Sequence, residues 1–143
     1  MRRRQFLAVS ALGLAAASRA IAATPKLRVA VIGHTGRGNF GHDVDKVWLG
    51  EPEVEVVAVA DADPTGLAAV QKRLKLDRGF ADYRQMLSAA RPDIVAVSPR
   101  FVDEHHDMIL AAIDSGARGI YVEKPFCRTP AEADAIVAGC EKK

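Results

Sequence analysis

The chain has 143 residues, 49% of them hydrophobic and 27% charged, which is ordinary for one globular domain with its own core. The formal net charge of +2 misleads, because Arg2, Arg3, Arg4 and Arg19 all lie in the first 22 residues, which contain no acid. The remainder carries 16 basic and 18 acidic residues, so the composition excludes a folded basic face for nucleic acid.

The first 22 residues are predicted to be an export signal peptide. A cationic start is followed by an apolar stretch over 6–17 and by an A-x-A cleavage site over 20–22, so that the mature chain would begin at Ala23. The apolar stretch is shorter than the ~20 residues of a membrane-spanning helix, so we expect no stable membrane anchor. The run "RRQFL" at 3–7 resembles the twin-arginine signal, although Arg2 stands where Ser or Thr is usual. We therefore expect a periplasmic or secreted protein, with an ordinary secretory leader as the alternative.

After the leader, apolar runs alternate with helical stretches. Short runs rich in β-branched residues predict buried strands at 27–33, 53–61, 93–99 and 119–125. Amphipathic stretches with capping residues, among them Thr129 before Pro130 and Gly116 after a helix, predict helices at 64–76, 83–90, 104–116 and 130–143. We also expect a helix after the first strand, beginning near residues 39–41 and containing Trp48. This alternation predicts an α/β fold with a doubly wound, Rossmann-like parallel sheet.

The carboxyl ends of the four predicted strands carry an unusual set of residues. They are the glycine loop over 33–38, Asp61, Ser98-Pro99 and Glu123-Lys124-Pro125. Ligands of open α/β sheets bind outside the carboxyl ends of the strands. Four such ends at one edge of one sheet therefore predict a single site there.

The glycine loop nearly matches the dinucleotide fingerprint G-x-G-x-x-G. Gly33 permits the tight turn after the strand. Gly38 stands in the place of the third glycine, which would let the following helix pack against the strand. Thr35 replaces the second glycine; its hydroxyl can donate to a phosphate oxygen, and Gly36 beside it supplies flexibility. The N–H groups near 39–41 would face the phosphates. A glycine-rich turn that binds nothing is the alternative, but the strand–helix–strand context favours binding.

Asp61 is the last residue of the second predicted strand. This position is that of the acid that accepts hydrogen bonds from the adenine ribose in a dinucleotide site. Its carboxylate would repel a 2′-phosphate, which favours NAD. Arg37 in the glycine loop can offset that repulsion, so NADP stays possible. The alternative for Asp61 is a turn residue, since "DADP" is also good turn chemistry.

Together, "VIGHTGRG", "VVAVAD", "VSPR", the following His, "SG" and "YVEKP" resemble the Gfo/Idh/MocA oxidoreductases, the glucose–fructose oxidoreductase and inositol dehydrogenase family, over residues 27–143. Ser98-Pro99 stands where the family has Thr-Pro, and the family's His aligns with His105. The resemblance implies that Lys124 lies beside the nicotinamide and substrate. It also implies a cis peptide between Lys124 and Pro125, because this peptide is often cis in the family.

On these grounds we predict two groups of site residues. The candidate catalytic residues are Lys124, a cation fixed at the mouth of the site, and His105, which packing or substrate-edge contact would also explain. The spacing of His, Cys and Asp predicts no metal site. The candidate cofactor-binding residues are Gly33, Thr35, Gly36, Arg37, Gly38, Asp61, Ser98, Pro99, Glu123, Lys124 and Pro125.

The resemblance further implies hydride transfer between nicotinamide C4 and the carbinol carbon of a sugar or cyclitol. It implies a sixth strand and a second α+β domain, which we do not find in this sequence. We therefore expect a signal peptide over 1–22 and a dinucleotide-binding domain over 23–143 that is incomplete at its C-terminus. Such a chain would be inactive alone and would form a homo-oligomer only in a full-length form. The alternative is a non-catalytic NAD-binding module or a remnant.

Overall fold

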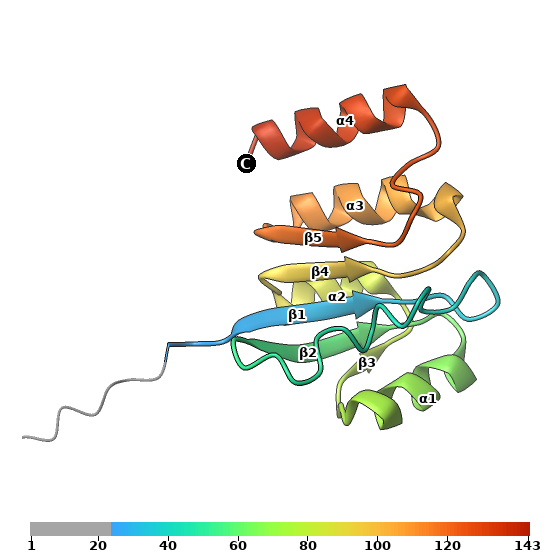
Figure 1. Cartoon of the computed structure of the whole chain (residues 1–143), viewed down its shortest axis with the longest axis vertical. Helices are drawn as coiled ribbons and strands as arrows, with labels where there is room; N and C mark the ends of the chain where they lie inside the picture. The colour runs from blue at the N-terminus through green and yellow to red at the C-terminus, as the bar shows by residue number, and fades with distance from the viewer. Residues whose placement is uncertain (1–23) are drawn as a thin grey trace, which may run out of the picture.

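In the computed structural model, which describes residues 24–143, a five-stranded parallel sheet is flanked by four α-helices (Figure 1). The predicted signal peptide lies outside the described residues. The strand order is β3-β2-β1-β4-β5, which confirms the doubly wound α/β prediction. The strands are β1 (Leu27–Ile32), β2 (Val54–Ala60), β3 (Gly79–Phe80), β4 (Ile94–Val97) and β5 (Gly119–Val122). The helices are α1 (Pro64–Leu74), α2 (Tyr83–Ala90), α3 (His105–Asp114) and α4 (Pro130–Glu141).

Local capping chemistry sets the helix boundaries. Asp63 accepts a hydrogen bond from the N–H of Gly66 at the start of α1, and Asp82 does the same for α2. Thr129 caps α4 by accepting from the N–H of Glu132, as predicted. Gly116 follows α3 with a φ of 87°, the left-handed conformation expected of a glycine after a helix. A short 3₁₀ turn, η1 (Val102–Glu104), leads into α3.

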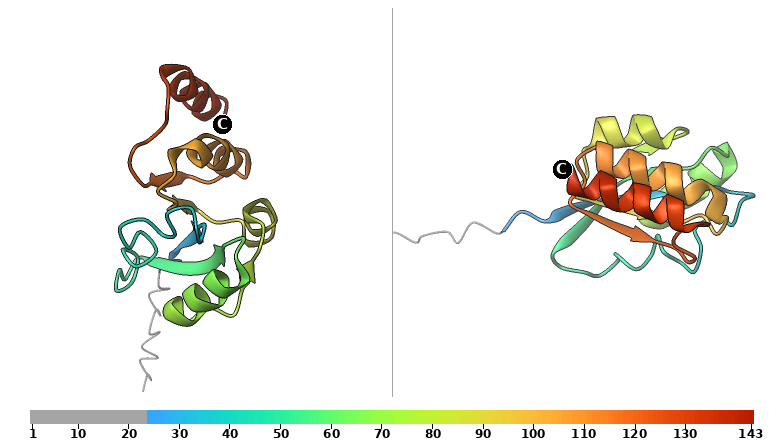
Figure 2. Two further views of the ribbon diagram at one scale, coloured as in Figure 1. Left: turned by 90° about the vertical axis from the view of Figure 1, so that its right-hand side faces the viewer. Right: turned by 90° about the horizontal axis from the view of Figure 1, so that it is seen from above.

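The sheet has a core on each face. On one face α2, α3 and α4 pack over side chains such as Ile32, Val95 and Val97. Figure 2 shows α3 and α4 running side by side on that face. On the other face α1 packs over Val31 and Val59. Helix α1 covers only part of the second face. Residues 34–50 cover the rest of the core on that face, with Phe40, Val44 and Trp48 among the packed side chains.

The helix predicted after β1 is wrong. Residues 34–50 form a succession of turns, and the non-glycine residues Asn39 and Asp43 have φ values of 54° and 59°. An α-helix needs φ near −63°, so backbone at positive φ interrupts any helix here. Asn and Asp tolerate this left-handed region better than other residues with side chains. Trp48 therefore lies in a turn, and no helix N-terminus follows β1 to face a phosphate.

Side-chain contacts hold residues 34–50 against the sheet. The Phe40 ring occupies the space above Gly33, where a Cβ would collide with the ring. Asp45 is buried and accepts from Arg73 of α1, with Nε and one terminal nitrogen 2.7 and 2.6 Å from Oδ2. The Trp48 ring meets Tyr121 of β5 edge-on, with 5.7 Å between centroids. Together with turn hydrogen bonds such as that from Val44 N–H to Phe40 O at 3.1 Å, these contacts hold the segment in place without a regular helix.

Two further features bear on the predictions. Strand β3 was missed because two residues cannot show a periodic pattern. Within residues 24–143, we find no helix whose length and apolar character would let it cross a bilayer.

Candidate functional site

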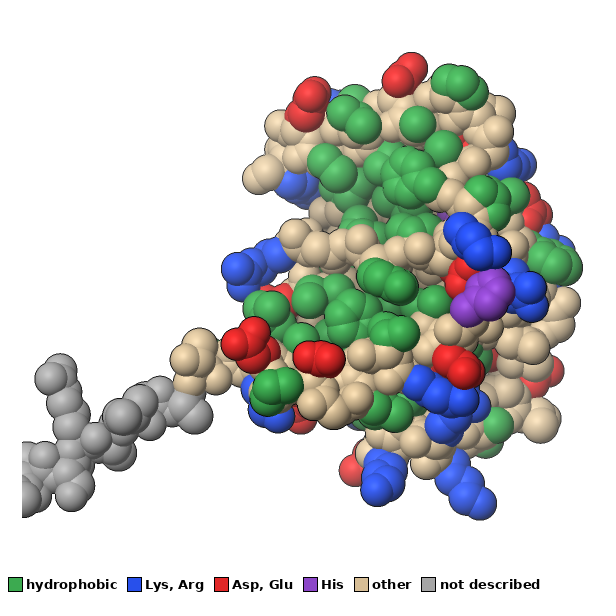
Figure 3. Space-filling view, viewed as in Figure 1, with side chains coloured by type: hydrophobic (Ala, Val, Ile, Leu, Met, Phe, Trp, Pro, Cys, Tyr) green, Lys and Arg blue, Asp and Glu red, His purple; other side chains and the backbone are tan. Residues whose placement is uncertain are grey.

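The strand register brings the predicted site residues to one edge of the sheet. Ile32, the last residue of β1, pairs with Ala60 of β2 and with Val97 of β4, and Val97 pairs with Val122 of β5. All arrowheads point to the same side in Figure 1, and the loops that follow them meet there. Figure 3 shows charged side chains and a histidine gathered at this edge, beside a face where apolar side chains predominate.

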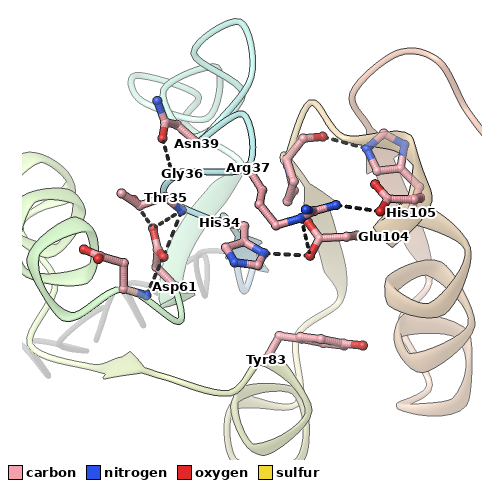
Figure 4. A network of polar contacts seen from close by, with 12 residues as sticks. His34, Thr35, Gly36, Arg37, Asn39, Asp61, Tyr83, Glu104 and His105 are labelled. Atoms are coloured by element: carbon pink, nitrogen blue, oxygen red, sulfur yellow. Dashed lines mark hydrogen bonds and ion pairs between the residues drawn. The ribbon is translucent and has the colours of Figure 1, made fainter.

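Asp61 is 1% exposed and is tied to the glycine loop (Figure 4). The N–H of Thr35 lies 3.0 and 3.1 Å from the two carboxylate oxygens, and its hydroxyl donates to Oδ2 at 2.6 Å. The N–H of Asp63 donates to Oδ1 at 3.0 Å. Gly66 in the first turn of α1 leaves room for Thr35, since a Cβ there would collide with the threonine hydroxyl. Thr35 therefore fixes the orientation of Asp61.

This arrangement changes the expected role of Thr35. Its hydroxyl donates to Asp61 in this structure, whereas we predicted that it would donate to a phosphate. A carboxylate has about four lone-pair positions, so Asp61 keeps some capacity to accept from a ribose hydroxyl. The ribose role of Asp61 stays a prediction.

Arg37 is held on the opposite side of the glycine loop from Asp61. Its terminal nitrogen lies 2.5 Å from Asp103 and its Nε 3.2 Å from Glu104, and the guanidinium stacks 4.8 Å from the centroid of Phe101. His34 also donates to Glu104, with Nδ1 2.7 Å from Oε1 (Figure 4). Two carboxylates therefore neutralise Arg37, which leaves it poorly placed to offset Asp61.

Glu123 is the second buried carboxylate at this edge. Its Oε2 accepts from the N–H of His42 at 3.1 Å, and its Oε1 accepts from the His42 ring at 3.0 Å and from the N–H of Lys124 at 3.1 Å. A Cβ on Gly41 would lie 2.5 Å from Glu123 Oε2, so only glycine allows this approach. Burial raises the pKa of Glu123, but the two N–H groups and the His42 ring outweigh it and hold the pKa below its usual value.

Ser98 and Gly38 join the ends of β1 and β4. Ser98 is fully buried, and its N–H donates to Ile32 O at 2.9 Å. A Cβ on Gly38 would collide with the backbone of Arg100, so this glycine permits close approach of two loops. We had expected Gly38 to let a helix pack against the strand.

The two candidate catalytic residues lie in different environments. Lys124 is exposed at the end of β5, and the peptide bond to Pro125 is cis, as the resemblance implied. His105 is completely buried, and its ring nitrogens Nδ1 and Nε2 lie 2.8 and 2.6 Å from the carbonyl oxygens of Pro125 and Pro99. In this conformation neither ring nitrogen is open to a substrate, so we now place His105 among the residues that position the site.

Two hollows open beside these groups. One of about 210 Å³ lies between the ends of β1 and β2 and the starts of α2 and α3, lined by Asp61, Ala62, Tyr83, Glu104 and Met108 among others. Figure 4 shows Tyr83 below His34 and Glu104, and Asp61 on the other side of His34. A second hollow, of about 300 Å³, is lined by His42, Val44, Tyr121, Val122, Glu123 and Lys124.

Sequence reasoning missed the partners of the predicted residues. His34 lies within the glycine loop and His42 lies after it, and neither is a fingerprint glycine. The carboxylates of Asp103 and Glu104 are far away in the sequence, 66 residues from Arg37 and 70 residues from His34 respectively. The acidic run "VDEHHD" at the start of α3 was a signal that a cation would lie nearby. The sequence did not show that this cation is Arg37.

Comparison with known proteins bears on the identity of this site. The profile of the Gfo/Idh/MocA family, described as an oxidoreductase family with an NAD-binding Rossmann fold, matches residues 27–143. The chain belongs to this family. The match covers every strand and helix of the structure, and the Gfo/Idh/MocA resemblance of the sequence is thereby confirmed.

Several named proteins are similar to this chain. D-apiose dehydrogenase of Paraburkholderia graminis is 33% identical over 75% of the chain, and D-glucoside 3-dehydrogenase of Escherichia coli K12 is 34% identical over 75%. An oxidoreductase from Agrobacterium radiobacter, solved with NAD⁺, L-tartaric acid and magnesium, superposes with a TM-score of 0.71 and 25% identity over 82% of this chain. The chain spans 28% and 29% of the two dehydrogenases and 33% of the solved structure.

Replacing Glu123 by Gln should lower the free energy of unfolding by about 1–3 kcal/mol at pH 7, because a buried charged acceptor is lost. The lowered pKa of Glu123 stabilises the fold above the unfolded-state value of about 4.3, and this stabilisation is lost as the pH falls through the folded-state pKa. Urea unfolding at a series of pH values should therefore show the stabilities of the two proteins converging as the pH falls below the unfolded-state pKa and through the lower folded-state pKa. Glu55→Gln, at an exposed carboxylate of β2, is the control. If the free energy of unfolding at pH 7 were the same in Glu123→Gln as in the parent chain, the structural role of Glu123 would be contradicted.

Proposed function

We propose that this chain is the cofactor-binding portion of an exported, NAD-dependent oxidoreductase that acts on a hydroxyl-bearing carbon of a sugar or cyclitol. The observation that carries the proposal is the meeting of the glycine loop, Asp61 and Lys124 at one sheet edge in a member of an NAD-binding oxidoreductase family. Two similar dehydrogenases are named for sugar substrates, D-apiose and a D-glucoside, which supports the substrate class.

The residues at this edge fit a dinucleotide. The glycine loop packs closely against neighbouring turns, since a Cβ at Gly33 would collide with the Phe40 ring and one at Gly38 with Arg100. The hollow of about 210 Å³ beside Asp61 is narrow and lined by Ala62, Tyr83 and Met108, which suits a flat adenine ring. In this placement the buried Asp61, which lines the hollow, accepts from the adjoining ribose, and the dinucleotide extends across the ends of β1 and β4 towards Lys124.

The reaction is a two-electron oxidation and its reverse. When bound, NAD⁺ would supply the acceptor for the hydride of the carbinol carbon, and the hydroxyl proton would pass to solvent water. In this chain the exposed ammonium of Lys124 supplies the positive charge at that end of the site. It orients the substrate oxygen and stabilises negative charge that develops on it. Glu123 fixes the backbone of Lys124 through the hydrogen bond to its N–H.

Substrate contacts must extend beyond the residues described here for this chemistry to proceed. Hydride transfer needs the reacting carbon within ~3–3.5 Å of the nicotinamide, and positioning supplies much of the rate. The similar dehydrogenases are more than three times as long as the matched region. We therefore propose that the 143-residue chain binds NAD without turning over sugar. Binding without turnover is also what a non-catalytic NAD-binding module would show.

Cofactor preference tests the proposal. Calorimetric titration of the chain with NAD and with NADP should show that NAD binds more tightly by about tenfold or more. The reason is that the carboxylate of Asp61 would repel the 2′-phosphate of NADP. Arg37→Gln should leave the ratio of the two affinities unchanged, since Asp103 and Glu104 already neutralise this arginine. If the chain bound neither dinucleotide, the proposed function would be contradicted. Tighter NADP binding that Arg37→Gln abolishes would assign the 2′-phosphate to Arg37 instead.

Export by the twin-arginine route is part of the proposal and rests on residues 3–7. Changing Arg3 and Arg4 together to lysine should abolish periplasmic accumulation, because the pathway reads the guanidinium pair and lysine keeps only the charge. Cell fractionation and immunoblotting measure the effect, with Arg2→Lys as the matched control. Undiminished export of the double variant would indicate an ordinary secretory leader.

A further inference from the structure

The hollow of about 210 Å³ beside Asp61 is rich in hydrogen-bond acceptors. Three of the residues that line it are acids, Asp61, Asp82 and Glu104, and none of its described lining residues is Lys or Arg. An ionised carboxylate accepts hydrogen bonds and donates none. A ligand that fills this hollow therefore has to present N–H or O–H groups to its walls.

Glu104 is the acid among the three with an oxygen left over. Asp61 and Asp82 already accept from backbone N–H groups of the turns that they hold. The Oε1 atom of Glu104 lies 2.7 Å from His34 Nδ1 and 3.2 Å from Arg37 Nε. Its Oε2 atom is buried and has no hydrogen-bond partner in the part of the chain that the structure describes. A buried acceptor without a donor costs free energy, so a ligand that supplies the missing N–H would bind more tightly.

Asp61 and Glu104 stand on different sides of this hollow. Asp61 follows β2, whereas Glu104 belongs to the turn η1 before α3, and Figure 4 shows His34 between them. With the ribose at Asp61, a purine base extends towards Glu104 along apolar side chains such as those of Tyr83 and Met108. Position 6 of a purine is on the ring remote from the sugar. Its substituent is therefore the group that reaches Glu104.

We propose that Glu104 selects adenine as the base of the bound dinucleotide, with Oε2 accepting a hydrogen bond from the 6-amino group. This rests on the proposed function, because it takes the ribose to lie at Asp61. The terminal torsion of a Glu side chain is broad, which lets the carboxylate turn Oε2 to the base. Hypoxanthine carries a carbonyl oxygen at position 6, and this oxygen would face the carboxylate with no proton between them. Its N–H at position 1 would reach Glu104 only if the base shifted, which the walls of the hollow resist.

The direct test is calorimetric titration of the 143-residue chain with NAD and with nicotinamide hypoxanthine dinucleotide, in which a carbonyl replaces the 6-amino group. We expect NAD to bind more tightly by about tenfold or more, since a site that accepts from an N–H rejects the analogue that lacks it. Equal affinities would overturn this inference and leave the proposed function standing. Binding of neither dinucleotide would remove the proposed function and this inference with it.

A pair of neighbouring variants assigns the preference to Glu104. Glu104→Gln keeps the shape of the side chain but offers an N–H to a carbonyl oxygen, so the preference for NAD should be lost or reversed. Asp103→Asn is the matched control, because Asp103 also contacts Arg37 but does not line the hollow, and its preference should equal that of the parent chain. A preference that survives Glu104→Gln, or that is lost in Asp103→Asn as well, would contradict the assignment. If Glu104→Gln does not fold, Glu104→Asp takes its place with the same expectation, since it keeps the charge beside Arg37 and withdraws the carboxylate from the base.

Discussion

The segment that leaves β1, residues 33–42, depends on two buried carboxylates, one from each side of the strand. Asp61 at the end of β2 accepts from the backbone and hydroxyl of Thr35, and Glu123 at the end of β5 accepts from the backbone and ring of His42. A dinucleotide-binding loop is ordinarily supported by the helix that follows it. Here turns follow the loop, so hydrogen bonds to the two carboxylates hold it against the neighbouring strands.

This anchorage explains the distribution of charge. Each buried carboxylate is satisfied by donors from the β1 segment, while the cation of that segment, Arg37, is neutralised by Asp103 and Glu104. Because turns rather than a helix follow β1, the phosphates of a bound dinucleotide would also lack the helix dipole that a fingerprint loop normally offers them. Lys124 remains as an exposed cation at the far end of the edge. In the function that we propose, the hydroxyl-rich end of the ligand lies at Asp61 and its reacting end lies at Lys124.

The sequence predicted the strands, helices and caps that position this site because each of them depends on residues close together in the chain. The four long strands, the four helices and the cap at Thr129 each follow from patterns within a dozen residues, and parallel strands necessarily bring their carboxyl ends together. The turns over 34–50 were mistaken for a helix because apolar residues such as Phe40, Val44 and Trp48 recur at nearly helical spacing. The left-handed backbone at Asn39 and Asp43 has only a weak signature in composition. Contacts such as Glu123 with His42, 81 residues apart, depend on the fold and have no local signal.

Residue-resolved amide hydrogen exchange at the β1 segment tests this account most directly. The N–H groups of Thr35 and His42 donate to the two buried carboxylates, whereas the N–H of Gly36 donates to the exposed side chain of Asn39. We predict that Thr35 and His42 exchange as slowly as the amides within β1, although both lie in turns, and that Gly36 between them exchanges rapidly. Rapid exchange at both Thr35 and His42 would contradict the claim that the carboxylates hold this segment.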